Sequence, residues 1–206
     1  MAKYRNILMM LAGIVLSALG MALYYYSALG SDPVSLFIDG LHIWLGLSYG
    51  TVLNGFNAVV LAVVVLFARN EARIGLVVSL VFSGTLLDMW TFFLESIFEN
   101  RTVFEKAIFL LMGILCLSIG TALFLESGLG AGPWDTVLVK ISHATSVPFR
   151  WVRGASDILF AVTGFFLGGI AGIGTWLSVL SVGTLIDAVR KAIQWFQTKD
   201  GALRRL

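Results

Sequence analysis

Long apolar segments, separated by short polar or glycine-rich breaks, dominate the hydrophobic pattern of the chain. Six segments are long enough to cross a bilayer, because about 20 helical residues cover a hydrocarbon layer of ~30 Å. They span residues 6–29, 49–68, 73–94, 107–127, 149–168 and 172–192. The pattern therefore predicts an all-α, polytopic membrane protein.

Two shorter helices are predicted between the first and second spans of each half, at residues 33–45 and 133–145. Each covers roughly 20 Å, which is too short to cross a membrane alone. Each helix is expected to lie in the membrane interface or to dip its proline end inward. If both were counted as spans, the chain would cross eight times instead of six.

The two halves of the chain carry an internal repeat. Residues 11–33 match 111–133 at ten of the twenty-three aligned positions, and residues 75–88 match 174–187 at six of fourteen. The glycine, proline, serine and aspartate identities are not explained by apolar composition alone. We interpret residues 1–98 and 103–206 as two copies of one unit, which together form one membrane domain. With three spans each, the copies would be inverted; with four, they would be parallel.

Charge is scarce and unevenly placed. Charged residues make up 13% of the chain and hydrophobic residues 58%, whereas a soluble domain has roughly 25% charged residues. With six spans and both termini in the cytoplasm, only Arg101 and Lys106 of the 14 lysines and arginines lie outside. This arrangement satisfies the positive-inside rule. The eight-span alternative satisfies it equally, with Arg69 and Arg73 outside.

The first and second spans of each half are joined by a Leu-Gly-x-x-Pro phrase, which contains Gly30 and Pro33 in one copy and Gly130 and Pro133 in the other. Glycine permits a sharp turn, and proline suits the first position of a helix. Asp32 is placed to cap the first short helix. An opened helix N-terminus can hold an anion, so we treat these residues, with the preceding Ser27 and Ser127, as candidate solute ligands.

The stretch from Gly128 to Asp135, supported by Gly-Thr-Leu-Ile-Asp at 183–187, resembles the YczE/YitT family of bacterial membrane proteins. The length of the chain fits the short YczE-like branch. The first copy departs from the family phrase, because Ser35 stands where the second copy has Asp135. The resemblance implies a membrane location and suggests solute movement, and it makes Asp135 a candidate ligand.

Carboxylates inside predicted spans are the strongest functional candidates, because an ionisable group in the membrane is costly. Asp88 and Asp187 occupy equivalent positions in the third spans. Asp187 is followed by Arg190 and Lys191, so an interfacial ion pair is an alternative role for it.

The second spans contribute Asn57 and Asp157, again at equivalent positions. Arg153 lies one helical turn before Asp157, so the two charges can neutralise each other or form part of a solute site. We expect Ser27, Asn57 and Asp88 to converge with Ser127, Asp157 and Asp187 near the bilayer centre, with Asp88 as the ion or proton carrier.

Other chemistries have little support in the sequence. The chain has two histidines and one cysteine, and it lacks phosphate-loop, His-Glu-x-x-His and Cys-x-x-Cys motifs. We therefore expect no enzyme activity, no metal site and no cofactor. The expected partners are membrane lipid and a small polar solute, without nucleic acid, and a homodimer is compatible with the sequence.

These features predict a multi-pass protein of the bacterial inner membrane with both termini in the cytoplasm. The predicted function is a secondary transporter or facilitative channel for a small polar solute. The alternative is an assembly or regulatory partner protein in the membrane without transport activity.

Overall fold

The computed structural model describes residues 2–47, 49–67, 74–97, 102–130, 132–169 and 171–203. In this part of the chain the regular structure is entirely α-helical, which confirms the predicted all-α class. The helices are α1 (Ala2–Ser27), α2 (Pro33–Leu45), α3 (Tyr49–Phe67), α4 (Ile74–Ile97), α5 (Val103–Glu126), α6 (Pro133–Thr145), α7 (Phe149–Phe166) and α8 (Ile173–Leu203).

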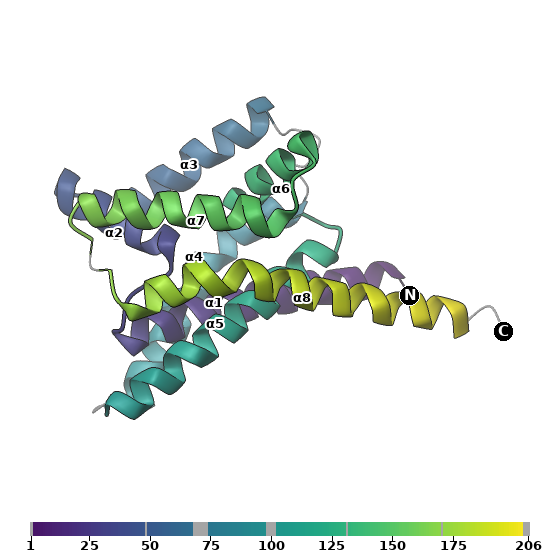
Figure 1. Cartoon of the computed structure of the whole chain (residues 1–206), viewed down its shortest axis with the longest axis horizontal. Coiled ribbons are helices and arrows are strands. Elements are labelled where there is room, and N and C mark those ends of the chain that lie inside the picture. Colours follow the sequence, from purple (N-terminus) through teal and green to yellow (C-terminus); the bar gives the residue numbers. More distant parts are fainter. Residues whose placement is uncertain are drawn as a thin grey trace.

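The helices form two groups, one above the other in Figure 1. The lower group contains α1, α4, α5 and α8, and the upper group contains α2, α3, α6 and α7. Helix α7 packs on both α2 and α8 and so joins the groups. Each predicted apolar segment became one helix, and the main difference is that α8 extends well beyond residue 192.

Helices α1 and α5 cross closely at glycines. Gly13 lies against Gly120, and Gly20 lies against Gly113, so the start of α1 meets the end of α5 and the two helices are antiparallel. A Cβ atom at Gly20 would lie 2.4 Å from the Leu117 nitrogen, which shows that the backbones touch. Small residues at a helix crossing commonly permit this approach in membrane proteins.

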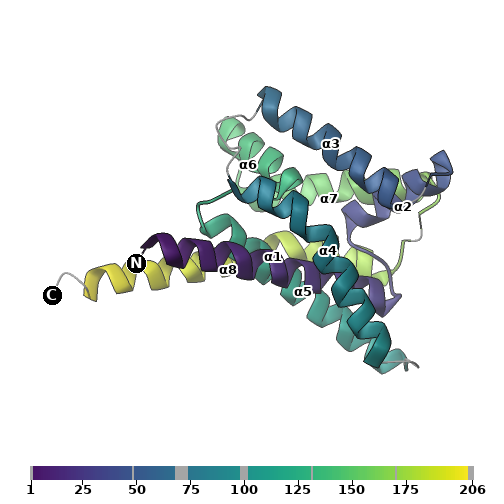
Figure 2. The ribbon, with the colours of Figure 1, turned by 180° about the vertical axis from the view of Figure 1, so that it is seen from behind.

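The ends of the helices are distributed between two sides of the molecule. The beginning of α1 and the end of α8 lie at the same side, where α3 also ends and α4 begins (Figures 1 and 2). The end of α4 and the beginning of α5 lie at the opposite side. The short helices α2 and α6 lie toward opposite sides (Figure 2). Arg69, Arg73 and Arg101, on which the charge argument partly depends, lie outside the described residues.

Four helices of the described chain, α1, α4, α5 and α8, are long and apolar enough to cross a membrane. The expectation of six such helices is therefore met only in part. Helix α7 has 18 residues and carries Arg150, Arg153 and Asp157, so it is too polar to qualify by composition. The apolar part of α3, Gly55–Phe67, is a shorter apolar helix, as is α2.

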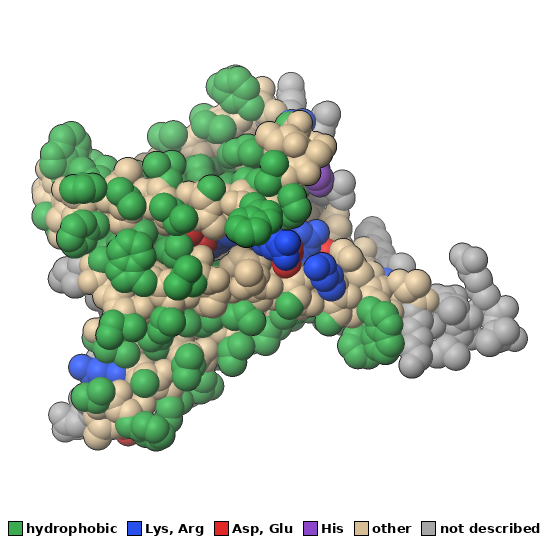
Figure 3. Space-filling view, in the orientation of Figure 1, with side chains coloured by type: hydrophobic (Ala, Val, Ile, Leu, Met, Phe, Trp, Pro, Cys, Tyr) green, Lys and Arg blue, Asp and Glu red, His purple; other side chains and the backbone are tan. Residues whose placement is uncertain are grey.

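The outer surface is largely apolar. Hydrophobic side chains cover most of the face in Figure 3, and charged side chains gather along the line where α7 meets α8. Large apolar residues such as Phe92, Phe166 and Leu180 are strongly exposed. Such a surface is unsuited to water and typical of contact with lipid tails.

Candidate functional site

The two Leu-Gly-x-x-Pro junctions adopt the sharp turns that the sequence predicts. Gly30 has a φ of +116° and Gly130 a φ of +133°, a region that favours glycine. The carbonyl of Leu29 accepts a 2.9 Å hydrogen bond from the Gly174 N–H, and that of Leu129 accepts a 2.8 Å bond from the Gly75 N–H. Each junction is thus fixed to the last long helix of the other half.

Ser27 and Ser127 complete the ends of α1 and α5. Both side chains are fully buried. The Ser27 hydroxyl donates to the Tyr24 carbonyl at 2.7 Å and accepts from the Leu29 N–H at 3.3 Å, and Ser127 makes the equivalent two bonds. The two hydroxyls bind the backbone of their own junctions, which is a common role of serine near a helix end.

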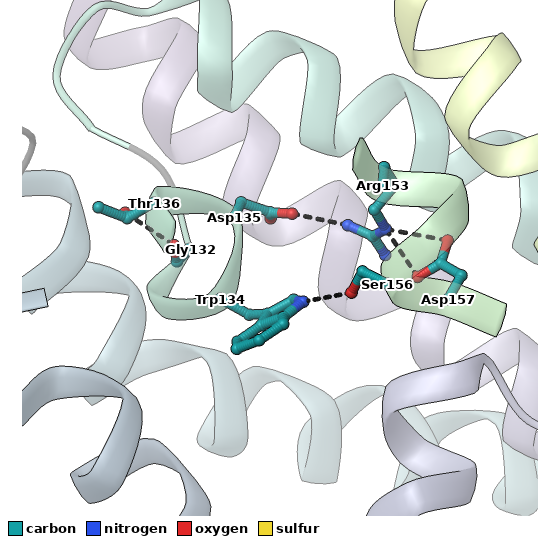
Figure 4. Close-up of polar contacts among 7 residues, drawn as sticks. All are labelled: Gly132, Trp134, Asp135, Thr136, Arg153, Ser156 and Asp157. Atoms are coloured by element: carbon teal, nitrogen blue, oxygen red, sulfur yellow. Dashed lines mark hydrogen bonds and ion pairs between the residues drawn. The ribbon is translucent and has the colours of Figure 1, made fainter. Parts of the chain in front are cut away.

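The short helices begin at the predicted prolines, Pro33 in α2 and Pro133 in α6. The Asp32 carboxylate accepts a 3.2 Å bond from the Ser35 N–H, so the predicted cap is confirmed. In α6 the N-cap residue is Gly132, which offers no side-chain cap. The first turn of α6 instead presents Trp134 and Asp135 to α7 (Figure 4).

Arg153 is the centre of a buried ionic cluster (Figure 4). Its Nε atom donates to both carboxylate oxygens of Asp157, at 3.0 and 3.1 Å, and its Nη1 atom donates to Asp135 Oδ1 at 2.6 Å. The side chains of Arg153, Asp157 and Asp135 are 8%, 1% and 18% exposed. Charge-assisted hydrogen bonds of this kind are strong. Because they are buried, removing one partner causes a larger loss of stability than it would at the surface.

A second contact lies beside the ion pairs. The indole N–H of Trp134 donates to the Ser156 hydroxyl at 2.8 Å. Neighbouring residues of α6, Trp134 and Asp135, therefore hold neighbouring turns of α7. This double contact fixes the start of the short helix against the long one.

Two further groups from the first half belong to the same neighbourhood. Asp32 is buried and close enough to act electrostatically on both Arg153 and Asp157. Tyr24 is 1% exposed, and its hydroxyl lies beside that of Ser178 and within electrostatic reach of Asp32, Asp157 and Arg153. We define the Arg153 cluster as Tyr24, Asp32, Asp135, Arg153 and Asp157.

An aromatic ring cluster adjoins the Arg153 cluster through Trp134. The Trp134 ring centroid is 4.8 Å from that of Phe160 and 6.1 Å from that of Phe56, and Phe37 lies 5.0 Å from Phe160. The four rings come from α2, α3, α6 and α7, so they form the apolar contact between these helices.

Comparison with known proteins gives the chain a family. Residues 4–191 match a protein family described as "Family of unknown function (DUF6198)". The chain belongs to this family. It is 31% identical over 192 residues to an uncharacterized protein of Haemophilus influenzae, covering 90% of this chain and 84% of that one.

Two further relatives of this chain come from Bacillus subtilis. One is the uncharacterized membrane protein YczE, 27% identical over 85% of this chain and 80% of the relative. The other is the uncharacterized protein YyaS, 25% identical over 88% of this chain and 90% of the relative. The predicted resemblance to YczE is thus confirmed. No solved structure matches this family member.

The predicted site residues of this family member are only partly brought together. Asp135 and Asp157 meet at Arg153, whereas Ser27 and Ser127 bind their own helix ends. Asn57 and Asp187 are half-buried on α3 and α8. The side chain of Asp88 lies outside the described residues, so its predicted role as ion carrier stays a prediction.

The predicted ion pair between Asp187 and Arg190 is not seen in the described part of α8, because Arg190 binds the carboxylate of Glu126. The Arg190 Nε atom donates to Glu126 Oε1 at 2.8 Å, and the guanidinium lies over the Phe149 ring. Tyr24, Trp134 and Ser156 also belong to this region, and none of them is predicted as a site residue from the sequence. The sequence predicts the capping role of Asp32, but the closeness of Asp32 to Arg153 depends on the packing of α2 against α7.

Proposed function

We propose that the protein is a small secondary transporter or facilitative channel for a polar solute in the bacterial inner membrane. The observation that carries this proposal is the Arg153 cluster, in which one buried guanidinium pairs with two carboxylates between α6 and α7, near the buried carboxylate of Asp32. Charged groups are costly in such surroundings and in membrane proteins commonly mark a solute or ion path. The proposed activity is movement of the solute without covalent chemistry.

The cluster forms where turns separate the long helices from the short ones. Asp32 and Asp135 lie at the N-termini of α2 and α6, directly after the Gly30 and Gly130 turns. Broken helices with their N-termini facing a central site are a recurrent feature of transporters. The position of the cluster therefore supports solute binding better than a purely structural ion pair on α7.

We also propose that the protein consists of two inverted repeats. Exchanging the halves turns α1 into α5 and α4 into α8, and the contact of α1 with α4 then becomes that of α5 with α8. The packing of α2 on α7 corresponds in the same way to that of α6 on α3. The antiparallel crossing of α1 and α5 favours inversion, because equivalent helices of parallel copies would point the same way.

The same arrangement supports six crossings with both ends of the chain on one side, and the positions of lysine and arginine predict that this side is the cytoplasm. Helices α3 and α7 each run from one side of the molecule to the other, beside helices that are long enough to span. Single cysteines on a Cys116→Ala background test this topology. An impermeant thiol reagent added outside should label position 100 and not position 70. Labelling at 70 alone would support eight crossings and parallel repeats.

Transport is tested by uptake into proteoliposomes with a panel of amino acids, amines, vitamins and small anions. We expect saturable uptake of at least one solute class, and loss of that uptake in Arg153→Gln. Glu95→Gln, which removes an exposed carboxylate at the end of α4, is the matched control. Absence of uptake for every solute, together with stable co-purification of a partner protein, would instead support an assembly role.

A further inference from the structure

We infer that the Arg153 cluster binds a small organic cation, whose ammonium group neutralises an excess of carboxylate charge and whose apolar part packs against Trp134. The inference rests on the proposed function, because it names the chemical class of the solute at the same site. It depends on three features of the described residues: the charge balance, an unpaired buried hydroxyl and the adjoining rings.

The charge balance of the cluster is negative. The charged groups that act on Asp157 are one cation, Arg153, and two further carboxylates, Asp32 and Asp135. The N-termini of α2 and α6 each add about half a positive charge beside Asp32 and Asp135. With all three carboxylates ionised, about one negative charge remains in a buried place, where an uncompensated charge is unfavourable. A bound cation removes this imbalance.

The Tyr24 hydroxyl is a second, independent sign of a ligand. It is buried against the Ser178 hydroxyl of α8, and neither hydroxyl makes a hydrogen bond of normal geometry to the other or to a third group. Buried polar groups almost always have a partner, so each exception calls for an explanation. The Tyr24 hydroxyl lies within electrostatic reach of Asp32 and Asp157, and an ammonium group supplies the donors that its oxygen can accept.

The surroundings favour an organic cation over a metal ion. Within the described residues, no three carboxylate, histidine or cysteine side chains are grouped closely enough to hold a metal. Trp134, by contrast, connects the cluster to Phe56 and Phe160. Aromatic faces attract ammonium groups and accept the apolar part of an amine.

Binding is measured on the intact protein in detergent by the shift of its thermal unfolding midpoint. The probes are ethylammonium, choline and phenethylammonium chlorides, compared with sodium chloride and sodium acetate at equal ionic strength. We expect saturable stabilisation by at least one of the three organic cations and none by acetate or sodium. Stabilisation by acetate, by sodium alone or by no probe would overturn the inference.

Two variants locate the binding. Asp32→Asn removes the charge but keeps a good helix cap, and it should weaken cation binding about tenfold, the usual effect of losing a charge-assisted bond. Tyr24→Phe keeps the buried ring and should weaken binding severalfold. Glu95→Gln, with the same change of net charge, should leave binding unchanged. Equal binding in all three variants would contradict the assignment.

The outcomes separate this inference from transport itself. Cation binding in detergent without uptake of any solute would retain the site and refute the transporter. Saturable uptake of an anion or neutral solute that none of the three organic cations inhibits would retain the transporter and refute the cation site.

Discussion

The two aligned halves of the chain share a backbone frame but differ in chemistry. Both have a serine-ended first helix, a positive-φ glycine, and a short helix opened by proline. Buried charge is concentrated in the second half. Its residues Trp134, Asp135, Arg153, Ser156 and Asp157 correspond in the alignment to Val34, Ser35, Leu53, Phe56 and Asn57.

This difference indicates that the backbone frame and the charged site depend on different residues. Local backbone bonds and glycines suffice to hold the frame, and they occur in both halves. The site needs only one set of charged side chains, and the first half adds Asp32, where the second half has Gly132. Five sets of variants can therefore break or sharpen the comparison.

The largest effect is expected from Arg153→Leu, which gives the second half the residue of the first. Asp135 and Asp157 would lose their cation, and removing one partner of a buried ion pair typically costs about 3–5 kcal/mol. The free energy of unfolding in detergent should fall by this amount and uptake should be lost. Unchanged stability would show that water reaches the carboxylates and that they are not effectively buried.

A matched triple variant tests whether uncompensated charge causes the loss of stability in Arg153→Leu. Arg153→Leu combined with Asp135→Ser and Asp157→Asn makes the second half resemble the first at all three positions. It should recover most of the stability lost by Arg153→Leu, because the uncompensated charges are gone. It should not recover uptake. Recovery of uptake would remove the cluster from the proposed solute site.

The next largest effect concerns the shared frame. Gly20→Ala and Gly120→Ala each place a Cβ atom within 2.4–2.5 Å of the opposite backbone, and overpacking of this kind costs about 1–3 kcal/mol. Two related halves predict similar losses for the two variants. Gly84→Ala is the control, because no atom lies within 4 Å of its new methyl group. A loss for only one of the pair would argue against a common frame.

The helices and junctions could be predicted from the sequence because their causes are local. Apolar length sets the long helices, and the Gly-x-x-Pro phrase sets the turns. The Asp32 cap follows from its position before Pro33. The same local reasoning could have identified Ser27 and Ser127 as helix-end residues, since a serine that ends a helix commonly binds the carbonyl one turn earlier.

The composition of the site could be predicted only in part. The spacing of Arg153 and Asp157 indicates a pair on one helix, but the addition of Asp135 requires α6 to pack on α7. The contributions of Tyr24 and Asp32 require α1 and α2 to pack near α7. Tyr24 in particular lies in an apolar run and carries no local signal that separates it from Tyr25 or Tyr26.

A smaller effect is expected from Trp134→Phe, which makes the second half more like the simple apolar packing of the first. The ring contacts with Phe160 remain, but the Ser156 hydroxyl loses its donor. One buried hydrogen bond contributes about 1 kcal/mol, which should appear as a lower free energy of unfolding. Trp176→Phe, at an exposed tryptophan on α8, should change stability little. Equal effects would show that the indole bond does not hold α6 to α7.

The smallest effect on stability, and the sharpest separation of frame from site, is expected at Asp32. Asparagine caps a helix as well as aspartate does, so Asp32→Asn should change the free energy of unfolding by only a few tenths of a kcal/mol. Asp32→Ala removes the 3.2 Å bond to the Ser35 N–H and should cost about 1 kcal/mol. Both variants remove the carboxylate charge near Arg153, so both should impair uptake alike. If uptake instead follows stability, so that Asp32→Asn transports normally and Asp32→Ala does not, then Asp32 belongs to the frame and not to the solute site.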